Sequence, residues 1–169
     1  MKIPVVLSTD LYYHIGDSDD HFDAACYLTC SEFEHRGILL DHNAGRRGRS
    51  QDGDRVLAKL MELSGNVHGL QNFHVNDEGD KALDNPCQDG QQLLRTALEG
   101  PGKLTIIAVG ACTDSGVALV RLPKLMKNKV ERIYLVATYA GHNLQTQERN
   151  AADDPVAPRL LLNLELPII

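Results

Sequence analysis

The feature that most constrains the fold is a series of short runs that are apolar throughout. Residues 104–109 (LTIIAV) are the clearest of these runs. Because such runs do not alternate between apolar and polar residues, they are typical of strands in a parallel sheet that is covered on both faces. The predicted strands are Lys2–Ser8, Arg36–Leu40, Leu104–Val109 and Arg132–Ala137, with Val67–Leu70 as a short additional strand.

Between these runs lie amphipathic segments and polar segments without a period. Gln51–Leu63 has an apolar stripe with helical spacing, and Asp154 precedes Pro155 as an N-cap precedes a proline at the first helical position. The predicted helices are His21–Phe33, Gln51–Leu63, Asp89–Leu98, Asp114–Met126 and Asp154–Asn163, and the predicted loops are Gln71–Pro86 and Thr138–Asp153. Strands and helices alternate, which predicts one doubly wound α/β domain over residues 1–169, with a mostly parallel sheet and a Rossmann-like core.

The charge balance argues against two classes of partner. The chain of 169 residues has a formal net charge of -6, whereas nucleic acids and anionic membranes attract basic surfaces. No apolar run approaches the roughly 20 residues that span a bilayer, and the first residues have no apolar stretch long enough for a signal peptide. We therefore expect a cytoplasmic protein that binds neither nucleic acid nor membrane.

Polar clusters directly follow several of the predicted strands. They are residues 10–20, 41–43, 110–114 and 142–150. Ligands of doubly wound sheets bind outside the carboxyl ends of the strands, so the fold is expected to bring these clusters together on one rim. Within the second cluster, Asp41 is either a site residue or a cap at the end of a strand, and the sequence does not decide between the two.

The first cluster is rich in aspartate, with Asp10, Asp17, Asp19, Asp20 and Asp23 between a buried strand and a helix. Carboxylates this close repel one another unless a cation lies between them. Oxygen ligands alone favour calcium or magnesium over zinc. The alternative is an acidic helix N-terminus, and we prefer that reading, or simple exposure, for Asp23. Asp10, Asp19 and Asp20 together predict a metal site.

Three motifs, in this order along the chain, resemble the inosine-uridine nucleoside hydrolase family. The family opens with an aspartate-rich turn of the type DTDxGxDDxxAL, and this chain has Ser8–Asp10 (STD) and then Gly16–Asp20 (GDSDD), with a few extra residues between them. Gly110–Asp114 (GACTD) stands where the family has GPLTN. Glu148–Asn150 (ERN), followed by Asp153–Pro155 (DDP), stands where the family has EFN and then DP. The resemblance covers the whole chain and the first half or so of a family member.

The resemblance implies a role for each matched polar residue. Asp10 would hold Ca²⁺ together with Asp20 and the main-chain carbonyl of Thr113, and Asp10 would also take the proton from the calcium-bound water. The other matched residues would bind the ribose hydroxyl groups: Asp19, Asn43, Asn143, Glu148 and Asn150, with His142 as a weaker match in place of Asn143.

The reaction that the resemblance implies is hydrolysis of the N-glycosidic bond of ribonucleosides to base and ribose. Such a reaction passes through an oxocarbenium-like state. A bound cation lowers the pKa of water and a carboxylate accepts the proton, while further carboxylates stabilise the developing positive charge. Two other functions stay open: an inactive, metal-stabilised nucleoside-binding or interaction module, and a metal-dependent phosphohydrolase on an unrelated α/β fold. A homo-oligomer is compatible with all three functions.

Two departures from the family pattern affect these expectations. The family supplies a further calcium-binding aspartate, often beside a leaving-group histidine, from its C-terminal part. This chain ends at Leu164–Ile169 (LELPII), where a further strand is expected to begin. We therefore expect a domain that is incomplete at its C-terminus and a weak hydrolase. Arg149 replaces an apolar family residue, and we expect it to point outward because its charge would oppose a cationic transition state.

Overall fold

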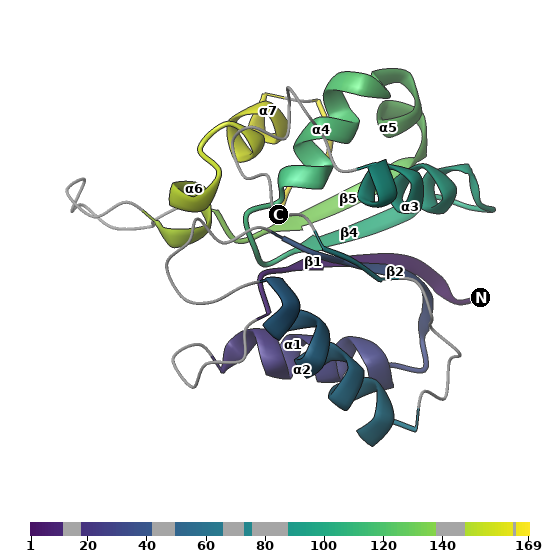
Figure 1. Ribbon diagram of the computed structural model, residues 1–169. Coiled ribbons are helices and arrows are strands. Elements are labelled where there is room, and N and C mark those ends of the chain that lie inside the picture. Colours follow the sequence, from purple (N-terminus) through teal and green to yellow (C-terminus); the bar gives the residue numbers. More distant parts are fainter. Residues whose placement is uncertain (12–17, 42–49, 66–72, 76–87, 138–147, 164) are drawn as a thin grey trace.

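The computed structural model describes residues 1–11, 18–41, 50–65, 73–75, 88–137, 148–163 and 165–169. Its centre is a five-stranded sheet in the order β3-β2-β1-β4-β5, drawn in Figure 1. Every neighbouring pair of strands is parallel. The strands are β1 (Ile3–Thr9), β2 (Phe33–Leu40), β3 (Phe73–Val75), β4 (Leu104–Ala108) and β5 (Val130–Leu135). The predicted doubly wound α/β class is confirmed.

Helices lie on both faces of the sheet (Figure 1). One face packs against α1 (Asp19–Thr29) and α2 (Ser50–Leu63), with Tyr27 and Leu57 fully buried between the layers. The opposite face packs against further helices, with Leu94, Met126 and Leu161 in its core. Those helices are α3 (Gln88–Glu99), α4 (Thr113–Arg121), α5 (Pro123–Lys129) and α7 (Ala157–Leu162), and the short α6 (Arg149–Asp153) precedes α7.

The elements differ from the predicted ones where local chemistry overrides the apolar pattern. The helix predicted over Asp114–Met126 is two helices, because Pro123 opens α5 after a non-helical residue, Leu122. Proline has no N–H to donate and blocks the preceding turn, so it begins a new helix. The first predicted helix begins at Asp19 rather than His21 and ends at Thr29, and Phe33 already belongs to β2.

Two predicted loops also contain structure. The end of the Thr138–Asp153 segment forms α6, and β3 lies inside the segment that was predicted to be a loop over Gln71–Pro86. Neither element has an apolar pattern long enough to be recognised, since α6 has five residues and β3 has three. The strand predicted over Val67–Leu70 lies outside the described residues.

Residues 167–169 add a short stretch of pairing beside β5. The N–H groups of Ile133 and Leu135 donate to the carbonyls of Pro167 and Ile169, at 2.9 and 3.0 Å. Ile168 forms a parallel bridge with Ile133. The strand predicted to begin in this segment is present only as this single bridge, outside the five strands of the sheet.

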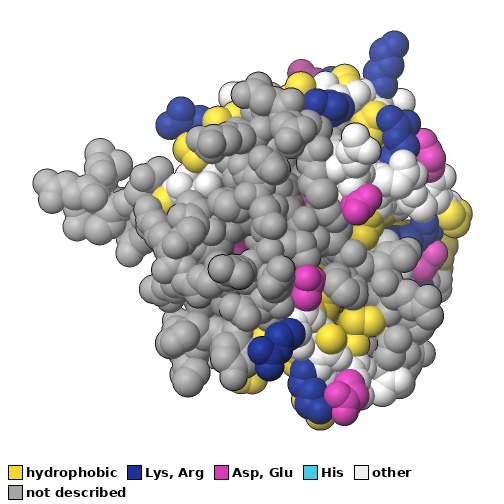
Figure 2. All heavy atoms as spheres, in the orientation of Figure 1, with side chains coloured by type: hydrophobic (Ala, Val, Ile, Leu, Met, Phe, Trp, Pro, Cys, Tyr) yellow, Lys and Arg dark blue, Asp and Glu magenta, His cyan; other side chains and the backbone are white. Residues whose placement is uncertain are grey.

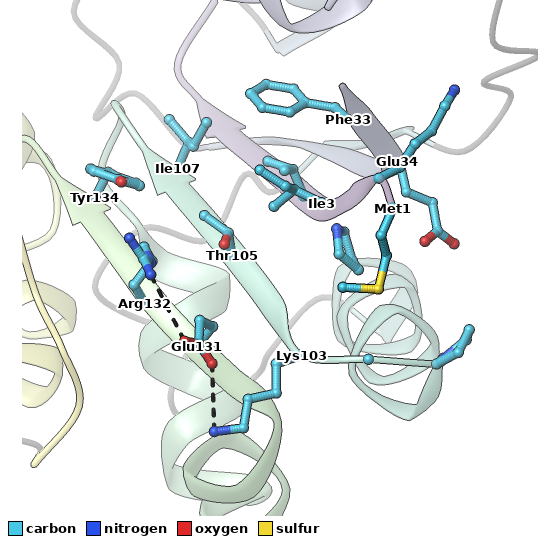
Figure 3. A pocket seen from close by; sticks show the side chains of 15 residues that line it. Met1, Ile3, Phe33, Glu34, Lys103, Thr105, Ile107, Glu131, Arg132 and Tyr134 are labelled. Carbon is cyan, nitrogen blue, oxygen red and sulfur yellow. Dashed lines mark ion pairs between the residues drawn. The ribbon is translucent and has the colours of Figure 1, made fainter. Parts of the chain in front are cut away.

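A wide hollow lies on the α1–α2 side of the sheet, toward the amino ends of the strands. It has a volume of about 920 Å³. Figure 3 shows Thr105 and Ile107 of β4 and Tyr134 of β5 turned toward it, with Ile3 and Phe33 at its other side. Ile3 is 50% exposed and Tyr134 is 38% exposed. On this side the cover by α1 and α2 is therefore incomplete over β4 and β5.

The described surface mixes charges of both signs. On the face in Figure 2, the coloured Lys and Arg side chains are interspersed with Asp and Glu. Pairs such as Lys59–Glu62 and Lys127–Glu165 lie at 2.8 Å. Within the described part of the chain, none of the helices has the length and apolar character to cross a membrane.

Candidate active site at the carboxyl end of the sheet

The ends of three neighbouring strands are joined by hydrogen bonds. The N–H of Asp41, just after β2, donates to the carbonyl of Thr9 in β1 at 2.8 Å. The N–H of Val109, just after β4, donates to the carbonyl of Ser8 at 2.9 Å. Asp10, Asp41 and the turn that begins α4 therefore follow adjacent strands and meet at one edge of the sheet, as the order of the motifs predicts.

Asp10 and Asp20 form a buried pair of carboxyl groups. Asp10 is 3% exposed and Asp20 is 7% exposed. Burial, and then the charges of Asp20 and Asp41, raise the pKa of Asp10 to about 8, while the charge of Arg149 acts in the opposite direction. Burial also raises the pKa of Asp20, although a 2.6 Å hydrogen bond from the hydroxyl of Thr9 favours its ionised form. Two such groups are stable side by side when they share a proton or a cation.

Asp19 lies beside this pair in the first turn of α1 and is exposed. Its Oδ1 accepts a 3.3 Å hydrogen bond from the N–H of Asp20. Its charge contributes to the raised pKa of Asp20. Asp19 therefore presents a solvent-accessible carboxylate beside the buried pair.

Thr113, in the first turn of α4, is hydrogen-bonded to Asp154, which precedes α7. Its hydroxyl donates to Oδ2 of Asp154 at 2.8 Å. Oδ1 of the same carboxylate accepts from the N–H groups of Val156 and Ala157, at 2.9 and 3.0 Å. Asp154 therefore binds two N–H groups just before and at the start of α7, but the N-cap residue is Val156 and the helix begins at Ala157, so the predicted N-cap at Asp154 followed by Pro155 at the first helical position was wrong by two residues. Its bond to Thr113 was not anticipated, because nothing in the local pattern links residues so far apart.

Glu148 and Asn150, both predicted to bind ribose, make main-chain contacts in this structure. The two oxygens of Glu148 accept from the N–H groups of Asn150 and Ala151, both at 2.9 Å, so Glu148 is the N-cap of α6. The side-chain amide of Asn150 donates to the carbonyls of Val109 and Val136, at 2.8 and 2.9 Å, and bridges the ends of β4 and β5. Both residues are half-buried at the predicted rim.

Arg149 does not point outward, so that expectation was wrong. The residue is half-buried, and its charge lowers the pKa of Asp10. It is the first residue of α6, and the cap from Glu148 fixes the direction of that helix. The sequence pattern did not reveal α6 and therefore could not reveal where the side chain at its first position would point.

The remaining predicted site residues fall outside the described part of the chain. These are Asn43 and Asn143, together with the weaker match His142. Their predicted contacts with the ribose stay predictions.

The polar groups at this edge supply oxygen atoms, the type of ligand that a hard divalent cation prefers. Asp10 and Asp20 supply carboxylate oxygens, and burial together with mutual repulsion disfavours their ionised forms unless a positive charge compensates them. Among the described residues, however, no group of three or more His, Cys, Asp or Glu side chains is placed to hold a metal ion. Asp10 and Asp20 are thus the two buried carboxyl groups that this edge brings together.

Known structures with the same fold include nucleoside hydrolases. No protein-family model and no curated protein matches the chain. The inosine-uridine preferring nucleoside hydrolase from Bacillus anthracis is similar with a TM-score of 0.68 and 18% identity, over 99% of this chain and 63% of that chain. A nucleoside hydrolase-related protein from Saccharophagus degradans, associated with carbohydrate metabolism, has a TM-score of 0.56 and 15% identity, over 79% of this chain and 38% of that chain.

At these identities the likeness concerns the fold. The chain shares its α/β fold with these nucleoside hydrolase structures, and this is the fold that its motifs predict. It spans less than two thirds of the length of the Bacillus anthracis protein that it matches, since the match covers 63% of that chain.

Proposed function

We propose that this chain carries a nucleoside-binding site at the carboxyl end of its sheet and hydrolyses the N-glycosidic bond of ribonucleosides. The observation that carries the proposal is the buried pair Asp10 and Asp20, directly after β1 and at the start of α1. The nucleoside hydrolase-like fold supports the same assignment. The proposed substrate is a ribonucleoside, and the proposed cofactor is Ca²⁺.

In this proposal Asp10, Asp20 and the main-chain carbonyl of Thr113 hold the cation. When bound, it lowers the pKa of a coordinated water so that the water is nucleophilic near neutral pH. Asp10 accepts the proton of that water. Asp19, exposed beside the buried pair, accepts a hydrogen bond from a ribose hydroxyl. The carboxylates around the sugar stabilise the positive charge that develops as the bond to the base breaks.

A second candidate is a nucleoside-binding module without turnover. It is favoured by the contacts of Glu148 and Asn150, whose polar atoms already bond to main-chain groups. Binding of ribose by these two residues would have to use the acceptor sites that those contacts leave over, the second lone pairs of the Glu148 oxygens and Oδ1 of Asn150. A module of this kind would keep the metal and the nucleoside but would not position the ribose for reaction.

The test is a turnover assay with inosine and p-nitrophenyl riboside, in Ca²⁺ and in EDTA. We expect Ca²⁺-dependent release of base that falls by about 10²–10⁴-fold in Asp10→Asn, the usual contribution of a general base. Ca²⁺-dependent binding of inosine without turnover would support the second candidate. Hydrolysis of p-nitrophenyl phosphate alone, or absence of both binding and turnover, would overturn both.

A further inference from the structure

Asp41 is a buried carboxyl group that the proposed reaction does not use. It follows the last residue of β2 and is 6% exposed. Its Oδ2 accepts two hydrogen bonds, from the hydroxyl of Ser8 at 2.5 Å and from the N–H of Cys112 at 3.1 Å. Its Oδ1 is buried and has no hydrogen-bond partner among the described residues. One side chain thus ties the end of β1 to the turn that begins α4.

That turn contains an unusual backbone conformation. Cys112 has φ 53° and ψ 24°, in the left-handed region, and among the described residues it is the only non-glycine with a positive φ. Such a conformation costs roughly 1–2 kcal/mol for an ordinary side chain and persists where the surroundings fix it. Cys112 is the N-cap residue of α4 but makes no side-chain cap. The Asp41 carboxyl therefore supplies, from another strand, a bond that fixes this residue.

Gly110 lies close to both the Asp41 carboxyl group and the backbone of Asp10. A Cβ at Gly110 would lie 2.9 Å from Oδ2 of Asp41 and 2.7 Å from the main-chain nitrogen of Asp10. A residue with a side chain would force these groups apart. Gly110 thus lets the Asp41 carboxyl and the Asp10 backbone reach the same turn, immediately before Thr113.

We propose that Asp41 is a positioning residue for the cation site: its bond to the Cys112 N–H holds the left-handed turn and so sets where Thr113 presents its main-chain carbonyl. The inference rests on the proposed function, because it concerns the same cation. It assigns Asp41 to the site and explains why a cysteine stands in a conformation that glycine adopts more readily.

The test measures the affinity for Ca²⁺ by calorimetry, well below the melting temperature of each variant. Removal of the partner of a metal ligand typically weakens metal binding about 10–100-fold, and we expect Asp41→Ala to weaken Ca²⁺ binding by a factor in that range. Asp41→Asn keeps an oxygen that accepts from Cys112, so its affinity should stay near that of the wild type. Ser8→Ala removes one of the two donors and should have a smaller effect in the same direction.

A double variant separates positioning from loss of structure. Glycine adopts a positive φ without strain, so adding Cys112→Gly to Asp41→Ala should restore much of the lost affinity. Cys112→Gly alone should change the affinity little. A general loss of stability in Asp41→Ala would not be repaired by a second change that removes a packed side chain, so a regain of affinity identifies the turn itself.

The outcomes distinguish the two levels of the proposal. Wild-type Ca²⁺ binding that Asp10→Asn abolishes, with equal affinities in wild type and Asp41→Ala, would overturn the positioning role and leave the proposed cation site intact. The same holds if the double variant binds as weakly as Asp41→Ala. A wild-type chain that does not bind Ca²⁺ would overturn both. If Asp41→Ala does not fold, Ser8→Ala with and without Cys112→Gly decides, and equal affinities of Ser8→Ala and wild type overturn the role.

Discussion

The charge of Arg149 acts on Asp10 in the same sense as a bound cation would. It lowers the pKa of Asp10 and lies half-buried at the start of α6. A positive charge at this place repels Ca²⁺ in the proposed site. Removal of the Arg149 charge also raises the proton affinity of Asp10, and this proton competes with the ion. The ion carries twice the charge of the proton, so its binding free energy gains more than that of the proton.

Arg149→Gln is therefore expected to tighten Ca²⁺ binding, by about two- to threefold after proton competition is subtracted, if the charges lie some 8 Å apart with water-like screening. Calorimetry at low and high ionic strength would measure the change, which salt should reduce. Arg159→Gln, an exposed position in α7, is the matched control and should have no such effect. Equal affinities of Arg149→Gln and wild type would place this charge away from the ion.

The titration of Asp41 should make the free energy of unfolding depend on pH. Burial raises its pKa to about 8, and the charges of Asp114 and Asp154 act in the same direction. The unfolded value is about 3.9. The folded protein thus keeps the proton to a higher pH than the unfolded chain. The contribution of protonated Asp41 to the stability of the folded protein is complete below the pKa that Asp41 has in the unfolded chain. It is lost as the pH rises through the pKa that Asp41 has in the folded protein.

Asp41→Asn cannot titrate, so its stability relative to the wild type should rise between about pH 4 and about pH 8. Urea unfolding of both proteins in EDTA at several pH values measures the difference. Asp89→Asn, an exposed position in the first turn of α3, is the control and should run parallel to the wild type. A constant difference between Asp41→Asn and wild type would mean that the buried carboxyl is not protonated when folded.

At the scale of elements, the contact between α4 and α7 depends on Gly116. A Cβ at this position would lie 2.7 Å from the Cβ and 2.8 Å from the Cα of Ala157. The second distance involves backbone, so α7 would have to move. We expect Gly116→Ala to lower the free energy of unfolding by about 1–3 kcal/mol, the usual cost of overpacking.

Urea unfolding would measure this loss. Val120→Ala on the same helix is the control, because Val120 is 53% exposed and does not need to pack. A loss below about 0.5 kcal/mol, typical of surface substitutions, would mean that α7 can shift without cost. In that case the bond from Asp154 to Thr113 would also adapt rather than fix the site.

The elements also show what the sequence could predict. The strands β1, β2, β4 and β5 each contain a run of apolar residues, and these runs were sufficient to predict both the parallel sheet and the rim where its polar clusters meet. The break at Pro123 was not predicted, although proline is common at the first position of a helix. The helix α6 is held by one carboxylate, that of Glu148, and has no apolar period of its own.

The same distinction applies to the candidate site. Which residues follow the strand ends was predictable, because the fold fixes it. The partners of those residues were not, because Asp41 bonds to Cys112 and Thr113 to Asp154 across distant parts of the chain. Sequence spacing carries no information on such pairs, and the outward direction expected for Arg149 was wrong for the same reason.

At the scale of the whole molecule, the hollow over β4 and β5 is an unusual feature for a parallel sheet. Parallel sheets are almost always covered on both faces, yet Tyr134 and Ile3 are 38% and 50% exposed here. Apolar dyes such as ANS bind exposed apolar surface. We therefore expect the folded protein to bind ANS, and Tyr134→Lys to reduce the fluorescence while the far-UV circular dichroism stays unchanged.

Phe22→Lys is the control for this experiment. Phe22 is 69% exposed on α1 and does not line the hollow. Its substitution should leave most of the dye bound. If both variants reduce the fluorescence equally, the dye binds to scattered apolar side chains and the hollow has no special affinity.

The pairing of residues 167–169 with β5 has a consequence for how copies of the protein meet. Without the 167–169 segment, the N–H groups of Ile133 and Leu135 would be unpaired donors at the sheet edge. Through such donors the sheets of two molecules can join edge to edge. Here Pro167 and Ile169 accept both bonds. With these bonds made, Ile133 and Leu135 cannot offer the same N–H groups to the edge strand of a second molecule.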